Sequence, residues 1–245
     1  MPAVMKAHSP SIAEQKKFYD SFLSKKNPVN HLQTARCGAI LMELSRLQLW
    51  TPRILDFGCG DGWLTAVLST FGETTGADLS PEAAAERFSG IRFVAADFNT
   101  WRPDLEPFDV VVSQEVIEHL EDQAHYLEIA ASLLKPGGYL ILTTPNARIT
   151  RAWRGHFDRQ PIENVLTAQE LRALLRRQFE MISLRTILPG YGNLGPGNAW
   201  AGLHHLLNSG KARALLLGLD LLRAYTRALE FSGLGLHFVA VAKRA

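Results

Sequence analysis

The stretch ILDFGCGDG, from Ile54 to Gly62, decides the fold of this chain. Its apolar start predicts a buried strand, and its alternating glycines predict a tight turn into a helix over residues 63–71. Glycine suits such a turn because a residue without a Cβ tolerates positive φ and lets the backbone approach a ligand. Strand, glycine turn and helix in this order are typical of a nucleotide-binding crevice. The G-x-G-x-G spacing differs from the G-x-G-x-x-G of dinucleotide-binding proteins, so a purely structural turn is the alternative.

The composition limits the class of protein. The chain has 245 residues, enough for one α/β domain with an insert, and a formal net charge of +2. That charge is too small to imply nucleic acid or an anionic membrane as a partner. Cys37 and Cys59 form no disulfide framework, which indicates a reducing compartment such as the cytoplasm. The N-terminal residues lack the apolar core of a signal peptide, and no apolar run is long enough to span a bilayer.

Strand and helix signals alternate along the chain. Expected strands after the first are 74–79, 91–97, 109–112, 138–146, 179–188 and 236–241, and expected helices are 11–22, 31–49, 124–134 and 167–179. Ser80 is expected to cap a helix that carries Pro81 in its first turn, and Thr167 with Glu170 to form a capping box. Repeated strand–helix units predict an α/β fold with a doubly wound sheet.

Two of these strands end in an acid. Asp78 follows the glycine turn by about twenty residues, the distance at which an acid ending the second strand reaches ribose hydroxyls. A carboxylate that interacts with a helix dipole is the alternative. Asp97 precedes Phe98, a pair that suits a purine because the ring stacks and the carboxylate accepts from an exocyclic amine. Ligands of open α/β sheets lie beyond the carboxyl ends of the strands, where both acids are expected.

Together, these motifs resemble class I S-adenosylmethionine-dependent methyltransferases, nearest the small-molecule branch that includes the ubiquinone-biosynthesis O-methyltransferases. The resemblance lies in DFGCGDG, the strand-ending Asp78, Ala-Asp97-Phe98, FDVVVSQEVIEHL, LKPGG and LTTPN. It covers residues 54–146 and resumes over 166–184. It implies a Rossmann-like, seven-stranded, mostly parallel sheet, with N-terminal helices, a helical insert before the last strand, and a hairpin between the last two strands.

The resemblance also implies how S-adenosylmethionine is held. In this family the glycine backbone meets the methionine part, the second-strand acid meets the ribose and the third-strand acid meets the adenine. N-terminal residues close the methionine end, for which Arg36 is a candidate because a guanidinium pairs with a carboxylate. A solvated arginine on an amphipathic helix is the alternative. The implied cofactor-binding set is Asp56, Gly58, Cys59, Gly60, Asp78, Leu79, Asp97, Phe98, Gln114, Tyr19 and Arg36.

The run from Glu115 to His119, EVIEH, is the main candidate for the chemistry. An oxygen acceptor must lose a proton, which calls for a base or a metal ion. A helical turn would place Glu115, Glu118 and His119 on one face, and similar runs occur in metal-dependent small-RNA 2′-O-methyltransferases. A divalent metal would then bind Glu115, Glu118, His119 and His156, although Asn164 stands where related chains carry histidine. Alternatively His119 is a general base beside Glu115, or Glu118 and His119 only order the loop.

Segments outside these motifs are expected to shape the acceptor site. The expected division is an N-terminal helical cap over 1–50, a methyltransferase core over 51–188 with 234–245, and a helical insert over 189–233. The insert's amphipathic helix, 211–231, is expected to cover the acceptor pocket, to pair with a second subunit in a homodimer, or to touch a membrane surface. The basic connection 147–161 either contacts an anionic acceptor or is a solvated loop.

The sequence therefore predicts transfer of a methyl group from S-adenosylmethionine to a hydroxyl, less readily an amine, of a small or lipid-linked metabolite. Two alternatives stay open: a metal-dependent RNA 2′-O-methyltransferase and a non-catalytic S-adenosylmethionine-binding partner subunit. The low net charge and the lack of an added RNA-binding domain disfavour nucleic acid. A NAD-dependent oxidoreductase would need the G-x-G-x-x-G spacing. The expected location is cytoplasmic, with peripheral membrane contact as an extension.

Overall fold

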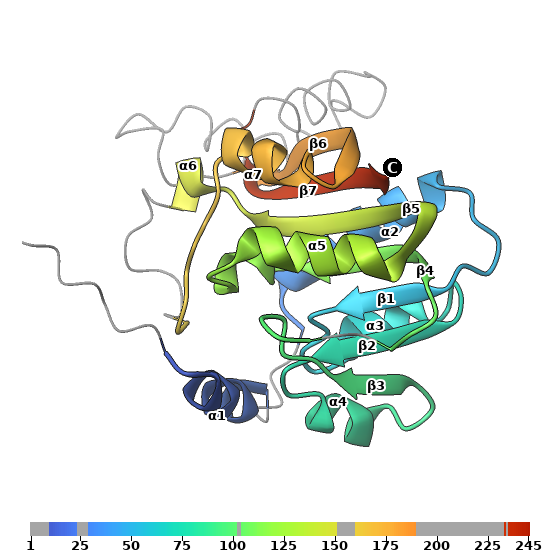
Figure 1. Ribbon diagram of the computed structural model, residues 1–245, viewed down its shortest axis with the longest axis vertical. Helices are drawn as coiled ribbons and strands as arrows, with labels where there is room; N and C mark the ends of the chain where they lie inside the picture. The colour runs from blue at the N-terminus through green and yellow to red at the C-terminus, as the bar shows by residue number, and fades with distance from the viewer. Residues whose placement is uncertain (1–9, 24–28, 102–103, 151–159, 190–232, 234) are drawn as a thin grey trace, which may run out of the picture.

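A seven-stranded sheet is the central layer of the computed structural model, which describes residues 10–23, 29–101, 104–150, 160–189, 233 and 235–245 (Figure 1). The strand order is β3-β2-β1-β4-β5-β7-β6. The strands are β1 (Ile54–Phe57), β2 (Thr74–Asp78), β3 (Arg92–Ala95), β4 (Phe108–Gln114), β5 (Leu134–Pro145), β6 (Phe179–Pro189) and β7 (Gly235–Arg244). β7 pairs antiparallel with both of its neighbours, β5 and β6, and the other pairings between these strands are parallel. The predicted doubly wound, mostly parallel sheet is confirmed, including the final hairpin.

Helices cover both faces of this sheet (Figure 1). One face packs against α2 (His31–Arg46) and α3 (Trp63–Leu68), and the opposite face packs against α5 (Gln123–Leu133) and α7 (Ala168–Leu175). Successive residues of β4 alternate between the two cores, as expected for a strand buried on both sides: Val110 and Val112 belong to the first, and Val111 to the second. The shorter elements are α1 (Ile12–Leu23), α4 (Glu82–Arg87), the 3₁₀ turn η1 (Ile117–His119) and α6 (Ala147–Thr150).

The fifth strand begins earlier than predicted. The expected helix ends at residue 134 and the expected strand starts at Gly138, which leaves a short connection between them. Helix α5 does end there, at Leu133, but β5 starts immediately, at Leu134. Leu134 already pairs with Phe108 of β4, and pairing resumes with Tyr139 opposite Val110. The predicted helix end is therefore confirmed and the predicted strand start is wrong, because the Pro-Gly-Gly segment forms an irregularity within the ladder.

Helix starts were predicted with mixed success. The capping box at the start of α7 is present, with the Thr167 N–H donating to Glu170 Oε2 at 2.7 Å. The predicted cap by Ser80 is wrong: Pro81 occupies the N-cap position of α4 and no side chain caps this helix. Instead the Ser80 N–H donates to Asp78 Oδ1 at 3.0 Å. Most of the predicted insert 189–233, including its helix, lies outside the described ranges.

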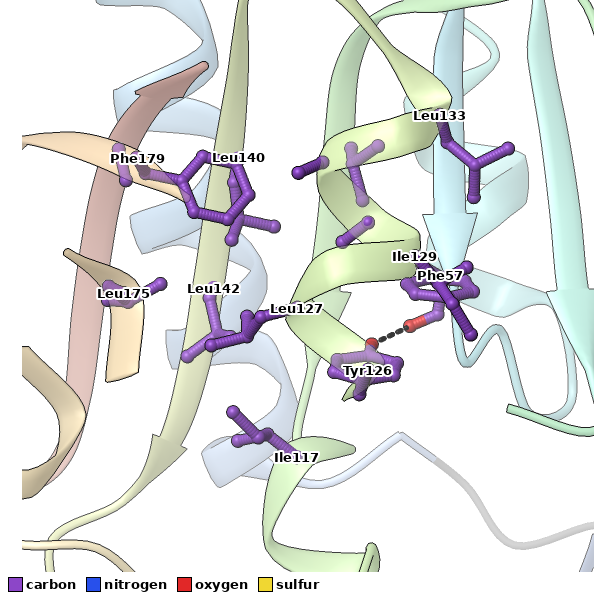
Figure 2. Packing of buried hydrophobic residues seen from close by; sticks show 14 of the residues in the cluster. Phe57, Ile117, Tyr126, Leu127, Ile129, Leu133, Leu140, Leu142, Leu175 and Phe179 are labelled. Carbon is purple, nitrogen blue, oxygen red and sulfur yellow. Dashed lines mark hydrogen bonds between the residues drawn. The ribbon is translucent and has the colours of Figure 1, made fainter. Parts of the chain in front are cut away.

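Tyr126 of α5 links this covering helix to strand β1, which leads into the glycine turn (Figure 2). Its ring stacks on Phe57 with the centroids 4.6 Å apart, and its hydroxyl donates to the Phe57 carbonyl at 3.1 Å. The same hydroxyl oxygen lies 2.8 Å from Ser113 Oγ of β4. All three side chains are buried. Since Phe57 immediately precedes the glycine turn, this contact fixes where the turn begins.

Replacing Tyr126 with phenylalanine is expected to lower the free energy of unfolding by about 1–3 kcal/mol, because it leaves the Phe57 carbonyl and the Ser113 hydroxyl buried without this partner. Urea unfolding measures the change. Tyr139→Phe is the matched control, since the half-buried Tyr139 ring lies beside Lys243 on the far side of β5. Equal losses in the two variants would contradict this role of the buried hydroxyl.

Candidate functional site

A cavity of about 450 Å³ opens at the carboxyl edge of the parallel strands, with α1 and α2 contributing to its wall. In Figure 1, α1 lies beyond the arrowheads of β1 and β2. The entire predicted cofactor-binding set lines this cavity: Asp56, Gly58, Cys59, Gly60, Asp78, Leu79, Asp97, Phe98, Gln114, Tyr19 and Arg36. The two predicted catalytic residues, Glu115 and His119, line it as well. Residues from seven elements or their ends thus converge on one space, although their binding roles stay predictions.

The glycine turn lines the cavity, and residues larger than glycine do not fit at two of its positions. Gly58 and Gly62 have φ of +96° and +79°. A Cβ at Gly58 would lie 2.2 Å from Val116 Cγ2, and a Cβ at Gly62 would lie 2.9 Å from the Cβ of Ala84. The Gly58 N–H donates to the Ala77 carbonyl of β2 at 2.8 Å. The turn is therefore held tightly between the ends of two strands and the start of α4.

Asp78 joins the tips of β1 and β2. Its Oδ2 accepts from the Gly60 N–H at 2.9 Å, and its Oδ1 accepts from the Ser80 N–H. Burial raises the pKa of Asp78 above its ordinary value, against the opposing effect of these backbone hydrogen bonds. The carboxylate therefore organises the glycine turn in addition to facing the cavity, which the helix-dipole interpretation did not foresee.

Asp97 and Phe98 stand at the end of β3. The Asp97 carboxylate accepts from the Asn99 N–H and from Thr100 Oγ1, both at 3.0 Å. The Phe98 ring packs edge-on against Phe57, with centroids 4.4 Å apart, and is nearly buried. Asp97 and Phe98 both line the cavity, so a carboxylate and an aromatic ring are available there for the predicted purine contact.

Two cavity residues carry buried polar atoms that have no hydrogen-bond partner among the described residues: Oδ1 of Asp56 and Nε of Arg36. The other oxygen of Asp56 accepts from Thr65 Oγ1 at 2.7 Å, and burial raises the pKa of this acid to about 7. Only 13% of the Arg36 side chain is exposed, so the interpretation of a solvated arginine is wrong. An unpaired acceptor and an unpaired donor fit a ligand with both an ammonium and a carboxylate, as the methionine part of S-adenosylmethionine has.

His119 is held in one tautomer. Its Nδ1 lies 2.9 Å from the carbonyl oxygen of Ile162, and because a carbonyl only accepts, Nδ1 carries the hydrogen. The neutral ring therefore keeps its lone pair on Nε2. Burial lowers the pKa of His119 below its ordinary value, although the Ile162 carbonyl and the Glu115 charge act in the other direction. The ring is thus neutral near pH 7 and able to accept a proton.

Glu115 and Glu118 have opposite electrostatic surroundings. Burial alone would raise the pKa of Glu115, but His237 and Arg36, helped by a hydrogen bond from Thr143, lower it to about 2. Burial and the nearby Glu115 charge raise the pKa of Glu118 well above its ordinary value. The surroundings therefore favour the ionised form of Glu115 and disfavour the ionised form of Glu118.

The predicted metal constellation does not form among the described residues, where no three His, Cys, Asp or Glu side chains are arranged to hold an ion. Glu115 Oε1 accepts from Thr143 at 3.0 Å and Glu118 Oε2 accepts from Thr144 at 2.9 Å. Since consecutive residues of β5 point to opposite faces of the sheet, these bonds draw the two carboxyl groups apart. The expected helical turn is also wrong for Glu115, which precedes η1 and has a φ of +57°.

His156 and Asn164, the other two positions considered in the metal hypothesis, provide no further support for it. His156 lies outside the described ranges. Asn164 stands where related chains carry histidine, and its polar groups bind the backbone of the EVIEH loop. Its Nδ2 donates to the Leu120 carbonyl at 2.9 Å, and its N–H donates to the Glu118 carbonyl at 2.6 Å. Asn164 therefore holds the segment after η1 in place.

Two residues of this region carry no sequence signal of function. Gln160 lines the cavity, and its Oε1 accepts from the Tyr19 hydroxyl at 3.1 Å. His237, in β7, places Nδ1 2.8 Å from Glu115 Oε2. Gln160 belongs to an irregular segment without a motif. For His237 the sequence shows only that it is the single polar residue within 236–241, which is not a functional motif.

Comparison with known proteins identifies the family. A family model described as a methyltransferase domain matches residues 29–184, more than half of the chain. Ubiquinone biosynthesis O-methyltransferase of Cereibacter sphaeroides is 38% identical over 102 residues, 38% of this chain and 41% of that protein. Trans-aconitate 2-methyltransferase of Methylobacterium radiotolerans is 36% identical over 110 residues, 42% of each chain. The match thus spans about two fifths of these curated relatives.

A solved structure extends the likeness to almost the whole fold. N-methyltransferase NodS of Bradyrhizobium japonicum WM9, in complex with S-adenosyl-L-homocysteine, has a TM-score of 0.62 and 19% identity, covering 94% of this chain and 98% of that one. At this identity the likeness concerns the fold. With the matched family model and the glycine turn at the carboxyl edge of a seven-stranded sheet, the chain belongs to the methyltransferase domain family, among the class I S-adenosylmethionine-dependent methyltransferases.

Proposed function

We propose that this protein transfers a methyl group from S-adenosylmethionine to the hydroxyl of a small metabolite with an apolar portion. The observation that carries the proposal is His119, a partly buried imidazole in the same cavity as the glycine turn, whose Nδ1 contact with the Ile162 carbonyl leaves the lone pair on Nε2. A hydroxyl acceptor needs such a base, whereas a carboxylate acceptor is already deprotonated.

The cofactor, when bound, supplies an electrophilic methyl group on a sulfonium. This chain would hold it by the backbone of the glycine turn, with Asp56 and Arg36 toward its ammonium and carboxylate and Asp78 toward its ribose. Asp97 and Phe98 would meet the adenine. The protein contributes chiefly position, because in-line transfer requires an aligned acceptor and exclusion of water.

The proton of the acceptor hydroxyl would pass to Nε2 of His119. The imidazolium formed in this way gains from the ionised Glu115, whose charge raises the affinity of His119 for a proton. Glu118 Oε1 lies 3.7 Å from Nε2, so a carboxyl oxygen is close to the ring once it has taken up the proton. Within the described residues, the base and its electrostatic support therefore come from the EVIEH segment itself.

The cavity offers apolar surface for the acceptor. Residues of α1 and α2 line part of it, and the apolar side chains that line the cavity include Ile12, Phe22, Leu23, Trp63, Leu64, Leu79, Ala96, Phe98, Val116 and Leu120. A relative named for ubiquinone biosynthesis supports a hydroxylated acceptor with a hydrophobic part, including a lipid-linked one. An amine acceptor, as the N-methyltransferase NodS suggests, is the less favoured form of the proposal.

Partners and location are extensions of this proposal. A homodimer through residues 189–233 and peripheral membrane contact depend on a segment that is almost wholly outside the described ranges. Among the helices that are described, none has the length and apolarity to cross a bilayer. Metal-dependent RNA 2′-O-methylation would need a metal site, and the described residues include no group of three His, Cys, Asp or Glu side chains that could hold an ion.

Isothermal titration with S-adenosylmethionine, S-adenosylhomocysteine and NAD tests the cofactor assignment, and formation of S-adenosylhomocysteine with hydroxylated, amine and carboxylate acceptors tests the reaction. We expect binding of the first two ligands, none of NAD, and turnover with a hydroxylated acceptor that persists in EDTA. Binding without turnover on any acceptor would favour the non-catalytic partner subunit. Loss of turnover in EDTA would restore the metal hypothesis.

A further inference from the structure

Three charged or ionisable side chains meet at the cavity wall: Arg36 and Glu115 line the cavity, and His237 is buried behind them. Glu115, after β4, places Oε2 3.6 Å from Arg36 Nη1 of α2 and 2.8 Å from His237 Nδ1 of β7. The His237 side chain is almost completely buried, and it does not line the cavity. Three segments that are distant in sequence therefore meet at a single carboxylate oxygen.

The sheet register explains why His237 reaches this oxygen. His237 lies opposite Pro145 of β5, and Thr143, two residues earlier in β5, lies opposite Gln114 at the end of β4. Side chains two residues apart share a face, so His237, Thr143 and the α2-facing residue Ile141 point to the same side of the sheet. Arg36 approaches that side from α2. Glu115 turns toward the same side through its left-handed backbone, a conformation that non-glycine residues adopt at a cost.

The two contacts of Glu115 Oε2 are unequal. The His237 distance of 2.8 Å is a close contact between the imidazole nitrogen and the carboxylate oxygen, although the ring is not aligned for a hydrogen bond. The Arg36 distance of 3.6 Å is longer than the usual 2.7–2.9 Å of a charge-assisted hydrogen bond, and Arg36 Nε has no partner among the described residues. Arginine and glutamate with freedom to approach form a bidentate pair. Here the carboxylate is engaged elsewhere, by Thr143 on one oxygen and His237 on the other.

We propose that His237 is a positioning residue that holds Glu115 away from Arg36 and so leaves the Arg36 guanidinium available to the carboxylate of the bound cofactor. This inference rests on the proposed function, since it takes S-adenosylmethionine as the ligand of Arg36. His237 touches neither cofactor nor acceptor in this arrangement. Its effect passes through Glu115, so it is expected in cofactor affinity rather than in the chemical step.

The test compares His237→Leu with His237→Asn by titration of S-adenosylhomocysteine, which needs no turnover. Leucine removes the polar contact, and asparagine can place its Nδ2 where the imidazole Nδ1 stands. We expect the leucine variant to bind about tenfold more weakly, because Glu115 then closes on Arg36, and the asparagine variant to bind nearly as wild type. With saturating cofactor, kcat of both variants should stay near wild type while KM for S-adenosylmethionine rises in His237→Leu.

A double-mutant cycle with Glu115→Gln separates this role from general damage to the fold. If His237 acts by restraining the Glu115 charge, His237→Leu should change affinity little once the Glu115→Gln substitution has removed that charge, and thermal unfolding of the variants should show the fold intact. Equal affinity of wild type and His237→Leu would overturn the inference, as would a loss that persists unchanged in the Glu115→Gln background. Failure of wild type itself to bind S-adenosylhomocysteine would instead overturn the proposed function.

Discussion

His119→Asn is expected to lower kcat by about 10²- to 10⁴-fold while leaving the affinity for S-adenosylmethionine near wild type. Asparagine can still donate from Nδ2 to the Ile162 carbonyl, so the loop geometry is preserved, but no lone pair able to take a proton remains at the Nε2 position. Steady-state formation of S-adenosylhomocysteine with a hydroxylated acceptor measures kcat, and isothermal titration measures affinity. His125→Asn is the matched control, because His125 lies at the start of α5 and does not line the cavity.

The pH dependence of the same reaction gives a second readout. Because burial lowers the pKa of His119 below its ordinary value of about 6.5, the neutral base persists down to that pH, and turnover should fall only on further acidification. The residual activity of His119→Asn should lack this acid limb. Full turnover of His119→Asn across the neutral range would show that the imidazole neither takes the proton nor supports the step, and would favour the loop-ordering interpretation.

Asp78→Ala is expected to weaken binding of S-adenosylmethionine by about 1–3 kcal/mol, roughly 5- to 150-fold in Kd. The change removes the predicted ribose contact. It also removes the acceptor of the Gly60 and Ser80 N–H groups, so the glycine turn loses the carboxylate that fixes it. Isothermal titration measures Kd, and Glu128→Ala on the exposed surface of α5 is the control for loss of one negative charge.

The two effects at Asp78 can be told apart with ligands. Methionine lacks the ribose, so an affinity loss through the glycine turn alone should weaken methionine and S-adenosylhomocysteine equally, whereas a direct ribose contact should weaken S-adenosylhomocysteine more. We expect the second pattern. Unchanged Kd for S-adenosylhomocysteine in Asp78→Ala would refute the ribose assignment.

The carboxylates of the EVIEH segment line up differently from the arrangement that the motif predicted. Helical spacing placed Glu115, Glu118 and His119 on one face, but the segment begins with a left-handed residue and forms a single 3₁₀ turn. The deciding interactions come from consecutive threonines of β5, which bind the two carboxyl groups on opposite faces of the sheet. Nothing within the segment itself contains that information.

Local sequence was sufficient wherever the determining interactions are short in range. The apolar run and glycines of residues 54–62 specify strand, turn and helix, because backbone freedom and burial are properties of the residues themselves. Thr167 and Glu170 specify their capping box for the same reason. The repeated strand–helix order then limits the topology, and Asp56, Asp78 and Asp97 reach one cavity because parallel strands end at one edge.

Tertiary structure alone decided which polar groups are paired and which are left free. By its spacing Arg36 could be a solvated helical residue, but only 13% of its side chain is exposed because α2 packs on β5, β6 and β7. His237 and Glu115 meet because β7 inserts antiparallel between β5 and β6. Sequence therefore determined the fold and the edge that carries the site, since these follow from local propensity and hydrophobic pattern. The charge state and freedom of each site residue depended on long-range partners, because burial and ion pairing are set by neighbours distant in the chain.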